Sequence, residues 1–351
     1  MRKIAVFFLL VWTAFMLQCG GGFHPEAQGV GPQGPPGPPG PPGPAGPPGP
    51  AGPGSQTLSV NCNAPAGQLN TIGGALKLLN PSAVNTINVS GSCTENLLIL
   101  SFDRLTLNAV NGSSINDASG GTGNVVQIED TKDFTVQGFA INGGNIGVFC
   151  DNLSVCRLNN DTIQGTTNNN VHGNGFGVQV ENSRAYLNGD TLQNNPGRGL
   201  SVINASLVFA GNVNVSNNAG EGVFVGFGAF LVLNPATIQN NGMDGVRVAD
   251  HATFRIVAGM ITRNGAAGVR LDGASEAEIQ GLDNPVTISG NGGNGVQLND
   301  LSFGRFEGLP SGEAALTITG NAPNDVQCNP LYSATRGATT DIGGGSTNCP
   351  N

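Results

Sequence analysis

Residues 199–202 read Gly-Leu-Ser-Val, and the pattern returns as Gly-Val-Phe-Val at 222–225 and Gly-Val-Arg-Val at 245–248. In each segment two hydrophobic residues flank one variable residue, which is the alternation of a short β-strand that buries one face. Related segments begin at Gly177, Gly268 and Gly295. The recurrence every 22 to 27 residues predicts a repeat architecture.

Two further strand-like segments lie inside the same period. One is represented by Ala185-Tyr186-Leu187, Leu207-Val208-Phe209, Phe254-Arg255-Ile256 and Ala277-Glu278-Ile279, and the other by Leu192, Val215, Ile238 and Ile261. The second group leads into Asn- and Gly-rich turns, whose residues tolerate the left-handed backbone of a sharp corner. Three short strands per period predict an all-β fold, a parallel β-helix of about nine coils, in which each strand pairs with its copy about 4.8 Å away.

The first residues predict export. Met1-Arg2-Lys3 is basic, and Ile4 to Leu17 is an apolar run that is too short for a comfortable membrane span. We therefore expect a signal peptide over residues 1–18. Cys19, followed by three glycines, resembles the lipidated cysteine of bacterial lipoproteins, although Gln18 departs from the small residue usual there. Membrane contact would then occur only through a lipid anchor, at the outer membrane or cell surface; simple secretion is the alternative.

After a linker at 19–30, residues 31–54 form eight consecutive Gly-X-Y triplets rich in proline. Glycine at every third position is what the crowded axis of a collagen triple helix requires, so this segment predicts a collagen-like stalk and a homotrimer. A single-chain, stiff proline-rich spacer is the alternative.

The remaining chain divides into an N-terminal cap at 55–85, the β-helix at 86–327 and a C-terminal tail or cap at 328–351. Thr71 can cap a short helix, with an apolar stripe that includes Ile72, Ala75 and Leu79, and Asn80-Pro81 would end it. Without Cys19, six cysteines remain and fall into three sequence-local pairs. The pairs, inferred from position among fifteen connectivities, are Cys62 with Cys93, Cys150 with Cys156, and Cys328 with Cys349.

The segment from Thr86 to Ile99, preceded by Thr71-Ile72-Gly73-Gly74-Ala75-Leu76, resembles the entry to pectin-lyase-like proteins. The resemblance extends over about residues 65–326 and implies a right-handed β-helix. It does not fix an activity, because this superfamily contains lyases, hydrolases, esterases, tailspikes and non-enzymatic adhesins.

One outward column of the predicted coils carries acidic residues. Glu129, Asp151 and Glu181 align on three successive coils, with Asp130 beside the first. Like charges on neighbouring strands repel each other, and a bound Ca²⁺ would compensate them. The column predicts a candidate calcium site, with exposed carboxylates that point into water as the alternative. No other cofactor is expected.

The central outward column contains Phe149, Phe224, Arg247 and Arg270, and Phe227 follows nearby. Aromatic and arginine side chains suit sugar stacking and anion contact, so these five residues form a candidate glycan-binding set. Ordinary surface decoration is the alternative. Phe224 and Phe227 are expected to be exposed and Phe230 to point inward.

The coil from Gly147 to Gly177 exceeds the period by about seven residues, which predicts an inserted loop near the acidic column. His172 in this loop is the one candidate general base, and a solvated loop histidine is its simpler interpretation. The hydrolase motifs of the superfamily have only partial matches in the chain, and the Asp pair with Arg of its esterases is missing.

The formal net charge is −9 and no basic run occurs in the repeats, which argues against a nucleic-acid partner. The favoured function is a non-catalytic bacterial surface or secreted protein that displays its β-helix on a stalk for adhesion or glycan binding. The alternative is a polysaccharide lyase or glycoside hydrolase. In both cases the expected partner is a polysaccharide or surface glycan.

Overall fold

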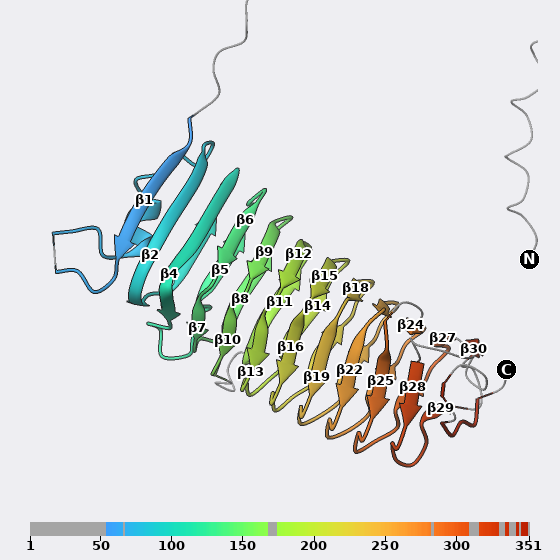
Figure 1. The fold of residues 1–351 in the computed structure, drawn as a ribbon. Helices are drawn as coiled ribbons and strands as arrows, with labels where there is room; N and C mark the ends of the chain where they lie inside the picture. The colour runs from blue at the N-terminus through green and yellow to red at the C-terminus, as the bar shows by residue number, and fades with distance from the viewer. Residues whose placement is uncertain are drawn as a thin grey trace, which may run out of the picture. The chain divides into compact units, whose positions relative to one another are not determined.

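The computed structural model describes residues 54–65, 67–167, 174–281, 284–308 and 316–329, the backbone of 334–336, and residues 342, 343 and 345–349. The signal peptide, Cys19, nearly all of the collagen-like segment and His172 lie outside these residues. The described chain from Gly54 onward is an elongated parallel β-solenoid of about nine turns, in which almost no helix occurs (Figure 1). No described helix is long and apolar enough to cross a membrane.

A complete coil contains three short strands joined by tight corners, as the sequence predicts. The first strands of all coils form a ten-stranded sheet, which lies along one side of the solenoid. Its strands are β3 (Leu97–Leu100), β5 (Val126–Glu129), β8 (Ile146–Asp151), β11 (Phe176–Glu181), β14 (Leu200–Ile203), β17 (Val223–Val225), β20 (Val246–Val248), β23 (Val269–Leu271), β26 (Val296–Leu298) and β29 (Val326–Cys328).

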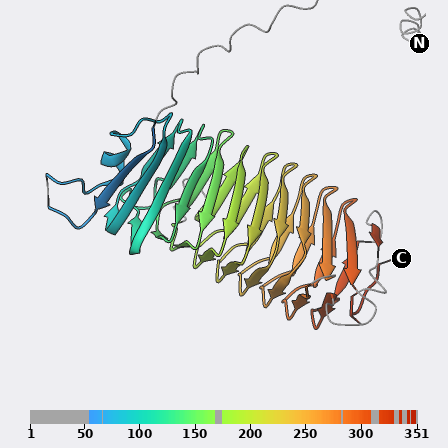
Figure 2. The same ribbon diagram turned by 45° about the horizontal axis from the view of Figure 1, so that its top comes forward.

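The other two strands of each coil belong to two rows, which join at the long bent strand β4 because it pairs with both β6 and β7. The first row contains β1 (Gln56–Asn61), β2 (Val84–Thr94), β4 (Arg104–Asn116), β6 (Phe134–Gln137), β9 (Val155–Asn159), β12 (Arg184–Asn188), β15 (Leu207–Gly211), β18 (Phe230–Leu233), β21 (Thr253–Ile256), β24 (Glu276–Gly281), β27 (Phe303–Gly308) and β30 (Ala334–Arg336). The second row contains β7 (Ala140–Asn142), β10 (Thr162–Gln164), β13 (Thr191–Gln193), β16 (Val213–Ser216), β19 (Ala236–Gln239), β22 (Gly259–Thr262), β25 (Val286–Ser289) and β28 (Leu316–Thr319). Figure 2 shows the rows stacked along the solenoid axis.

The core is a continuous apolar column inside the coils. Strand residues alternate between buried and partly exposed, so each coil contributes Val, Ile, Leu or Phe side chains to one cluster that extends from Val60 to Cys349. The stacking places equivalent side chains above one another, as with Val223, Val246 and Val269. The regular period of the sequence thus becomes a regular packing of the core.

The N-terminal end is closed by a shorter helix than the sequence suggested. Helix α1 (Ile72–Leu76) is capped by the Thr71 side chain, which accepts a hydrogen bond from the Gly74 N–H at 3.1 Å. Leu79, expected on the same helical stripe, is buried by the turn that follows. Strand β1, inside the segment expected to be a cap, pairs in parallel with β2, so the sheet begins at Gln56.

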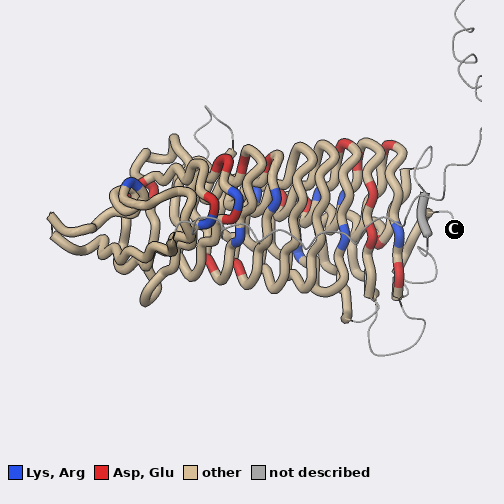
Figure 3. The backbone as a smooth tube through the Cα atoms, turned by 90° about the horizontal axis from the view of Figure 1, so that it is seen from above, with Lys and Arg blue, Asp and Glu red and all other residues tan. Residues whose placement is uncertain are grey.

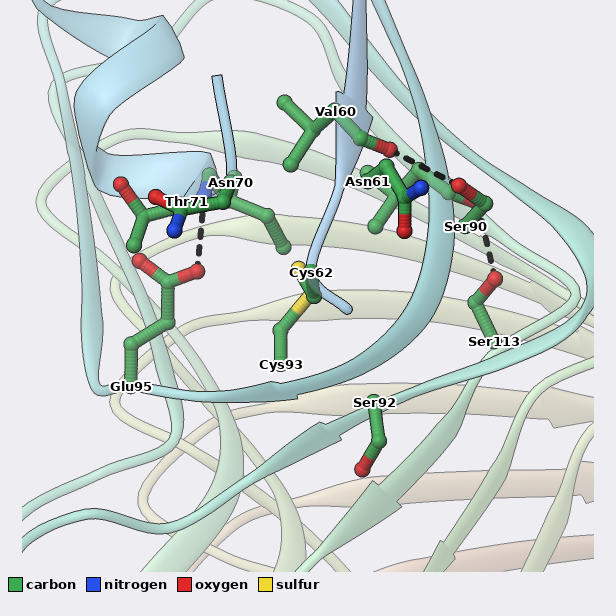
Figure 4. The surroundings of a disulfide bond; sticks show 12 residues. Val60, Asn61, Cys62, Asn70, Thr71, Ser90, Ser92, Cys93, Glu95 and Ser113 are labelled. Carbon is green, nitrogen blue, oxygen red and sulfur yellow. Dashed lines mark hydrogen bonds between the residues drawn. A yellow bond between two sulfur atoms is a disulfide. The ribbon is translucent and has the colours of Figure 1, made fainter. Parts of the chain in front are cut away.

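All three predicted disulfides are present: Cys62–Cys93, Cys150–Cys156 and Cys328–Cys349. The first joins the N-terminal segment to the first complete coil, beside Glu95 and Thr71 (Figure 4). The second links β8 to β9 across one corner of the same coil. Each bridge therefore ties segments that the solenoid already brings together.

Two details of register correct the sequence analysis. The residue that pairs with Tyr186 is Phe209, so the inward–outward–inward triplet of β15 is Val208-Phe209-Ala210 rather than Leu207-Val208-Phe209. Phe230 points outward and is half-buried, whereas Leu231 and Leu233 point into the core. A one-residue shift exchanges the two faces of a strand, which explains both errors.

Candidate functional site

The outward side of the ten-stranded sheet carries the columns in which the sequence predicted chemistry. Its central column is continuous through direct strand pairing. From the first coil onward it contains Leu98, Gln127, Phe149, Gln179, Ser201, Phe224, Arg247, Arg270 and Gln297. Phe149, Phe224, Arg247 and Arg270 of the glycan-binding candidates therefore share one column.

Phe227 does not belong to this column. It lies at the corner after β17 with a left-handed backbone (φ 55°) and is 53% exposed. Phe224, which was expected to be exposed, is only 6% exposed, because the guanidinium of Arg198 lies 3.8 Å from its ring centroid. The ring also fills the space beside Gly226, where a Cβ atom would come within 2.6 Å of it. The two phenylalanines do not form an exposed aromatic pair.

Arg198 and Arg247, which both adjoin Phe224, belong to a group of six charged residues from neighbouring coils. We call this group the charged cluster: Arg198, Glu221, Asp244, Arg247, Arg270 and Asp272. Glu221 is the link between two arginines, with Arg198 Nε at 3.2 Å and Arg247 Nη1 at 3.7 Å. Asp272 links Arg247 and Arg270 in the same way, at 3.2 and 3.0 Å. The cluster thus spans the coils from Arg198 to Asp272 with three charges of each sign.

Burial makes these charges unequal. Burial acts to raise the pKa of Glu221, but the positive charge of Arg198, the Glu221 backbone N–H and Arg247 outweigh it, so its pKa lies below the usual value. Asp244 occupies the position equivalent to Glu221 in the next coil. The two coils are joined there by the Gly222 N–H, which donates to the Asp244 backbone carbonyl at 3.0 Å. Burial and the charge of Glu221 raise the pKa of Asp244, although it accepts a hydrogen bond from the Ala267 N–H at 2.8 Å. Two neighbouring carboxyls therefore differ in their tendency to hold a proton.

Arg198 is the cation most affected by its surroundings. It lies between the rings of Phe224 and Phe176, the latter at 5.2 Å, and its burial lowers its pKa despite the charge of Glu221. A weakly hydrated guanidinium on an aromatic face, with an exposed portion, is suited to bind a carboxylate or another anion.

The predicted acidic column exists as a geometric feature. Glu129 pairs with Asp151, and Glu181 follows Val180, which pairs with Cys150. Burial and the charges of Glu181 and Glu129 raise the pKa of Asp151, opposed by the hydrogen bond from the Asn152 N–H. Exposed Asp130 lies at the corner and accepts a hydrogen bond from the Ser101 hydroxyl at 2.8 Å.

Amide side chains surround two of these carboxylates. Glu181 accepts hydrogen bonds from Asn204 at 2.6 Å and Gln179 at 3.1 Å, and Glu129 accepts from Gln127 and Asn152. Among the described residues, the only three metal-ligand side chains whose ligand atoms lie within 4.8 Å of one another are Cys62, Cys93 and Glu95. In that group the two sulfurs are bonded to each other, and Glu95 accepts hydrogen bonds from two N–H groups at the start of α1 (Figure 4).

Four of the six residues of the charged cluster were not predicted from the sequence. Arg198, Glu221 and Asp244 each immediately precede the repeated glycine of their coil, at 199, 222 and 245. The signal was therefore present as a third column at a fixed distance from that glycine. The predicted strands begin at the glycine and so exclude these three residues. Asp272 lies in the same column as Glu129, Asp151 and Glu181, but only after three coils without a carboxylate.

Comparisons with known proteins agree with this architecture. A family model described as a right-handed β-helix region matches residues 198–327. No curated protein sequence matches the chain. Among solved structures, the pectate lyase Pel9A is 10% identical, with a TM-score of 0.59 over 84% of this chain and 82% of that chain.

An alginate lyase from Paenibacillus sp. str. FPU-7 is 13% identical, with a TM-score of 0.53 over 80% of this chain and 98% of that chain. The enzymatically active domain of tailspike protein 2 from bacteriophage CBA120 is 11% identical, with a TM-score of 0.50 over 79% of this chain and 47% of that chain. These likenesses concern the fold, and they show that the solenoid is a right-handed parallel β-helix with pectate-lyase-like structural neighbours.

Proposed function

We propose that this chain acts on an acidic polysaccharide that lies along the ten-stranded sheet, as a polysaccharide lyase or glycoside hydrolase. The observation that carries the proposal is the charged cluster, in which three arginines and a carboxyl pair with opposed pKa shifts occupy neighbouring coils of one face. Two structural neighbours, a pectate lyase and an alginate lyase, support the same class of substrate.

The arginines are the groups that would hold the polymer. Their coils repeat about every 4.8 Å along the axis, so an extended chain of anionic sugars can contact several coils at once. Arg247 and Arg270 remain partly exposed, with 34% and 39% of their side chains accessible. A ligand carboxylate can therefore reach them without disrupting the sheet.

The opposed pKa shifts of the two carboxyls match the acid and base of a hydrolase. Glu221 and Asp244 are 6% and 5% exposed, so the bound polymer must open the charged cluster to reach them. Asp244, with its raised pKa, can donate a proton to the glycosidic oxygen as the bond to the anomeric carbon breaks. Glu221, with its lowered pKa, can accept a proton from the water that attacks that carbon. After one turnover Asp244 has lost a proton and Glu221 has gained one. Proton exchange with solvent returns both carboxyls to their starting states.

Hydrolysis of uronate polymers by the full chain tests this proposal, with reducing ends measured for a hydrolase and ultraviolet absorbance of unsaturated products for a lyase. We expect Glu221→Gln and Asp244→Asn each to reduce kcat by about 10²- to 10⁴-fold, the usual contribution of a general acid or base. Glu276→Gln, on the first row of strands rather than the ten-stranded sheet, is the control and should keep full activity.

Activity should also fall on both sides of an optimum. Acidification through the lowered pKa of Glu221 removes the base, and alkalinisation through the raised pKa of Asp244 removes the acid. Absence of cleavage on pectic, alginate and glucuronate polymers would contradict the proposal, as would full activity in both variants.

A second function, non-catalytic display for adhesion or glycan binding, is favoured by the ion pairs that already engage all three arginines of the charged cluster. Export, the lipid anchor at Cys19 and trimerisation through residues 31–54 are further proposals from the sequence. They would place either function at the cell surface.

A further inference from the structure

Two polar side chains in the middle of the ten-stranded sheet have no partner for a buried atom. Ser201 is 1% exposed and Gln179 is 8% exposed, and they pair with each other across neighbouring strands β14 and β11. Within the part of the chain that the structure describes, neither the Ser201 Oγ nor the Gln179 Oε1 makes a hydrogen bond.

Other glutamines of the same column do have hydrogen-bond partners for their side-chain oxygens. Gln127 accepts a hydrogen bond from Asn124 at 3.2 Å, and Gln297 accepts one from Asn294 at 3.3 Å. A buried polar atom without a partner destabilises the fold, so two such atoms side by side require an explanation. A ligand that supplies the missing bonds is one explanation, because it recovers this energy on binding.

The chemistry of the two atoms limits what the ligand can be. Gln179 donates its Nε2 to Glu181 at 3.1 Å, which directs Oε1 away as a pure acceptor. The ligand must therefore bring a donor, and the Ser201 hydroxyl can either donate to it or accept from it. A hydroxyl group satisfies both atoms.

An anion-binding group lies beside this pair. Phe224 is the strand neighbour of Ser201, and the Arg198 guanidinium lies on the ring of Phe224 at 3.8 Å. Arg198 retains 23% of its side-chain exposure and has the long, rotatable stem that can move aside for a ligand. Hydroxyl acceptors and a cation thus adjoin each other on one face.

We propose that Gln179, Ser201 and Arg198 form a specificity-determining subsite for one unit of a polyhydroxylated anion, with a sugar hydroxyl on Gln179 and Ser201 and its carboxylate on Arg198. The subsite rests on the proposed function, since it places one residue of the bound polymer next to Glu221. It adds a requirement: the ligand needs hydroxyls as well as charge.

Isothermal titration of the full chain with uronate oligosaccharides tests the subsite, with polyglutamate as a probe that carries carboxylates without sugar hydroxyls. Ser201→Ala and Gln179→Leu should each weaken oligosaccharide binding about tenfold and leave polyglutamate binding unchanged. Arg198→Gln should weaken both, and Gln297→Leu, in the same column with its own partner, should weaken neither.

Thermal unfolding separates this role from a structural one. Because the Ser201 hydroxyl has no partner, Ser201→Ala should not lower the melting temperature. Ser206→Ala is the matched comparison and should lower it, since the Ser206 hydroxyl donates to the Ile203 carbonyl at 2.6 Å.

Each result decides between the subsite and the proposed function. Wild-type binding that depends on Gln179 and Ser201, without cleavage, supports the subsite and overturns the enzymatic function. Cleavage by the wild type, with unaltered oligosaccharide affinity in Ser201→Ala and Gln179→Leu, supports the enzymatic function and overturns the subsite. In that case the two side chains contact only solvent. Failure of the wild type to bind galacturonate, mannuronate, guluronate and glucuronate oligosaccharides overturns both.

Discussion

At the scale of single residues, two buried aspartates show how the solenoid changes acid–base behaviour. Asp161 and Asp190 are 1% and 0% exposed and occupy successive coils, where the Asp161 N–H donates to Asp190 at 2.8 Å. Burial, together with the charge of Asp190, raises the pKa of Asp161 to about 8, although backbone N–H groups oppose the shift. Burial raises the pKa of Asp190 to about 7.

These shifts predict how stability depends on pH. A carboxyl whose folded pKa exceeds its unfolded value stabilises the fold fully below the unfolded pKa of about 3.8, and the contribution disappears as pH rises toward 8. The melting temperature of the wild type should therefore fall by several degrees between pH 5 and pH 8. Asp161→Asn should show a flatter curve, at a lower starting value because an amide nitrogen cannot accept the N–H bonds. Equal slopes in both proteins would contradict the assignment.

The acidic column leads to a second prediction at this scale, that of calcium binding. Burial and, to a smaller extent, the charges of Glu181 and Glu129 raise the pKa of Asp151, and a divalent cation would relieve the repulsion among the three carboxylates. Calcium at about 1 mM should then raise the melting temperature by a few degrees in the wild type and not in Asp151→Asn. If calorimetry detects no binding below millimolar calcium, the site is excluded.

The sequence predicted which residues share a column, but not which of them are covered by side chains from neighbouring coils. The central column was predictable, because Phe149, Phe224, Arg247 and Arg270 keep a constant distance from the repeated glycine. The burial of Phe224 was not, since it depends on Arg198, which reaches the ring from a neighbouring coil.

At the scale of elements, the corner after the second row of strands carries a ladder of buried asparagines. Asn195, Asn218, Asn241, Asn264, Asn291 and Asn321 stack, and each Nδ2 before the last donates to the next Oδ1 at 2.9 to 3.0 Å. The residue before each of the first three, such as Asn240 (φ 56°), has the left-handed backbone that the turn requires. The sequence predicted the turn; the ladder is a property of stacked turns.

Removal of one member should destabilise the fold more than removal of its exposed neighbour. Asn241 donates to Asn264 and to the Val215 carbonyl, and its Oδ1 accepts two bonds from Asn218. Asn241→Ala leaves these buried groups without partners, so the free energy of unfolding should fall by about 3 kcal/mol or more. Asn240→Gly keeps the left-handed backbone and should cost much less. Chemical denaturation of both variants measures the difference, and similar losses would contradict the role of the ladder.

At the scale of the whole molecule, acidic and basic residues are interspersed along the middle of the solenoid, while the upper edge in Figure 3 carries acidic residues alone. The charged cluster follows this pattern, because each arginine faces a carboxylate from a neighbouring coil or strand position. A polymer bound along the axis must exchange ion pairs within the protein for its own. The arginines therefore hold the polymer by exchanging one carboxylate for another, and the hydrogen bonds to Ser201 and Gln179 add to that affinity.

The sequence by itself determined the fold class, the three strands of a coil and the central column, because a solenoid places equivalent residues of each period above one another. The disulfide pairs were predicted from the short sequence separation of their cysteines and are confirmed by the structure. Only the tertiary structure decided which carboxyls have raised or lowered pKa values, which buried polar atoms lack hydrogen-bond partners and which aromatic rings are covered. Those properties depend on the burial and charge contributed by neighbouring coils. Glu221 and Asp244, 23 positions apart in the chain, acquire opposed pKa shifts because the charge and hydrogen bond of Arg198 outweigh burial at Glu221, whereas burial and the charge of Glu221 prevail at Asp244.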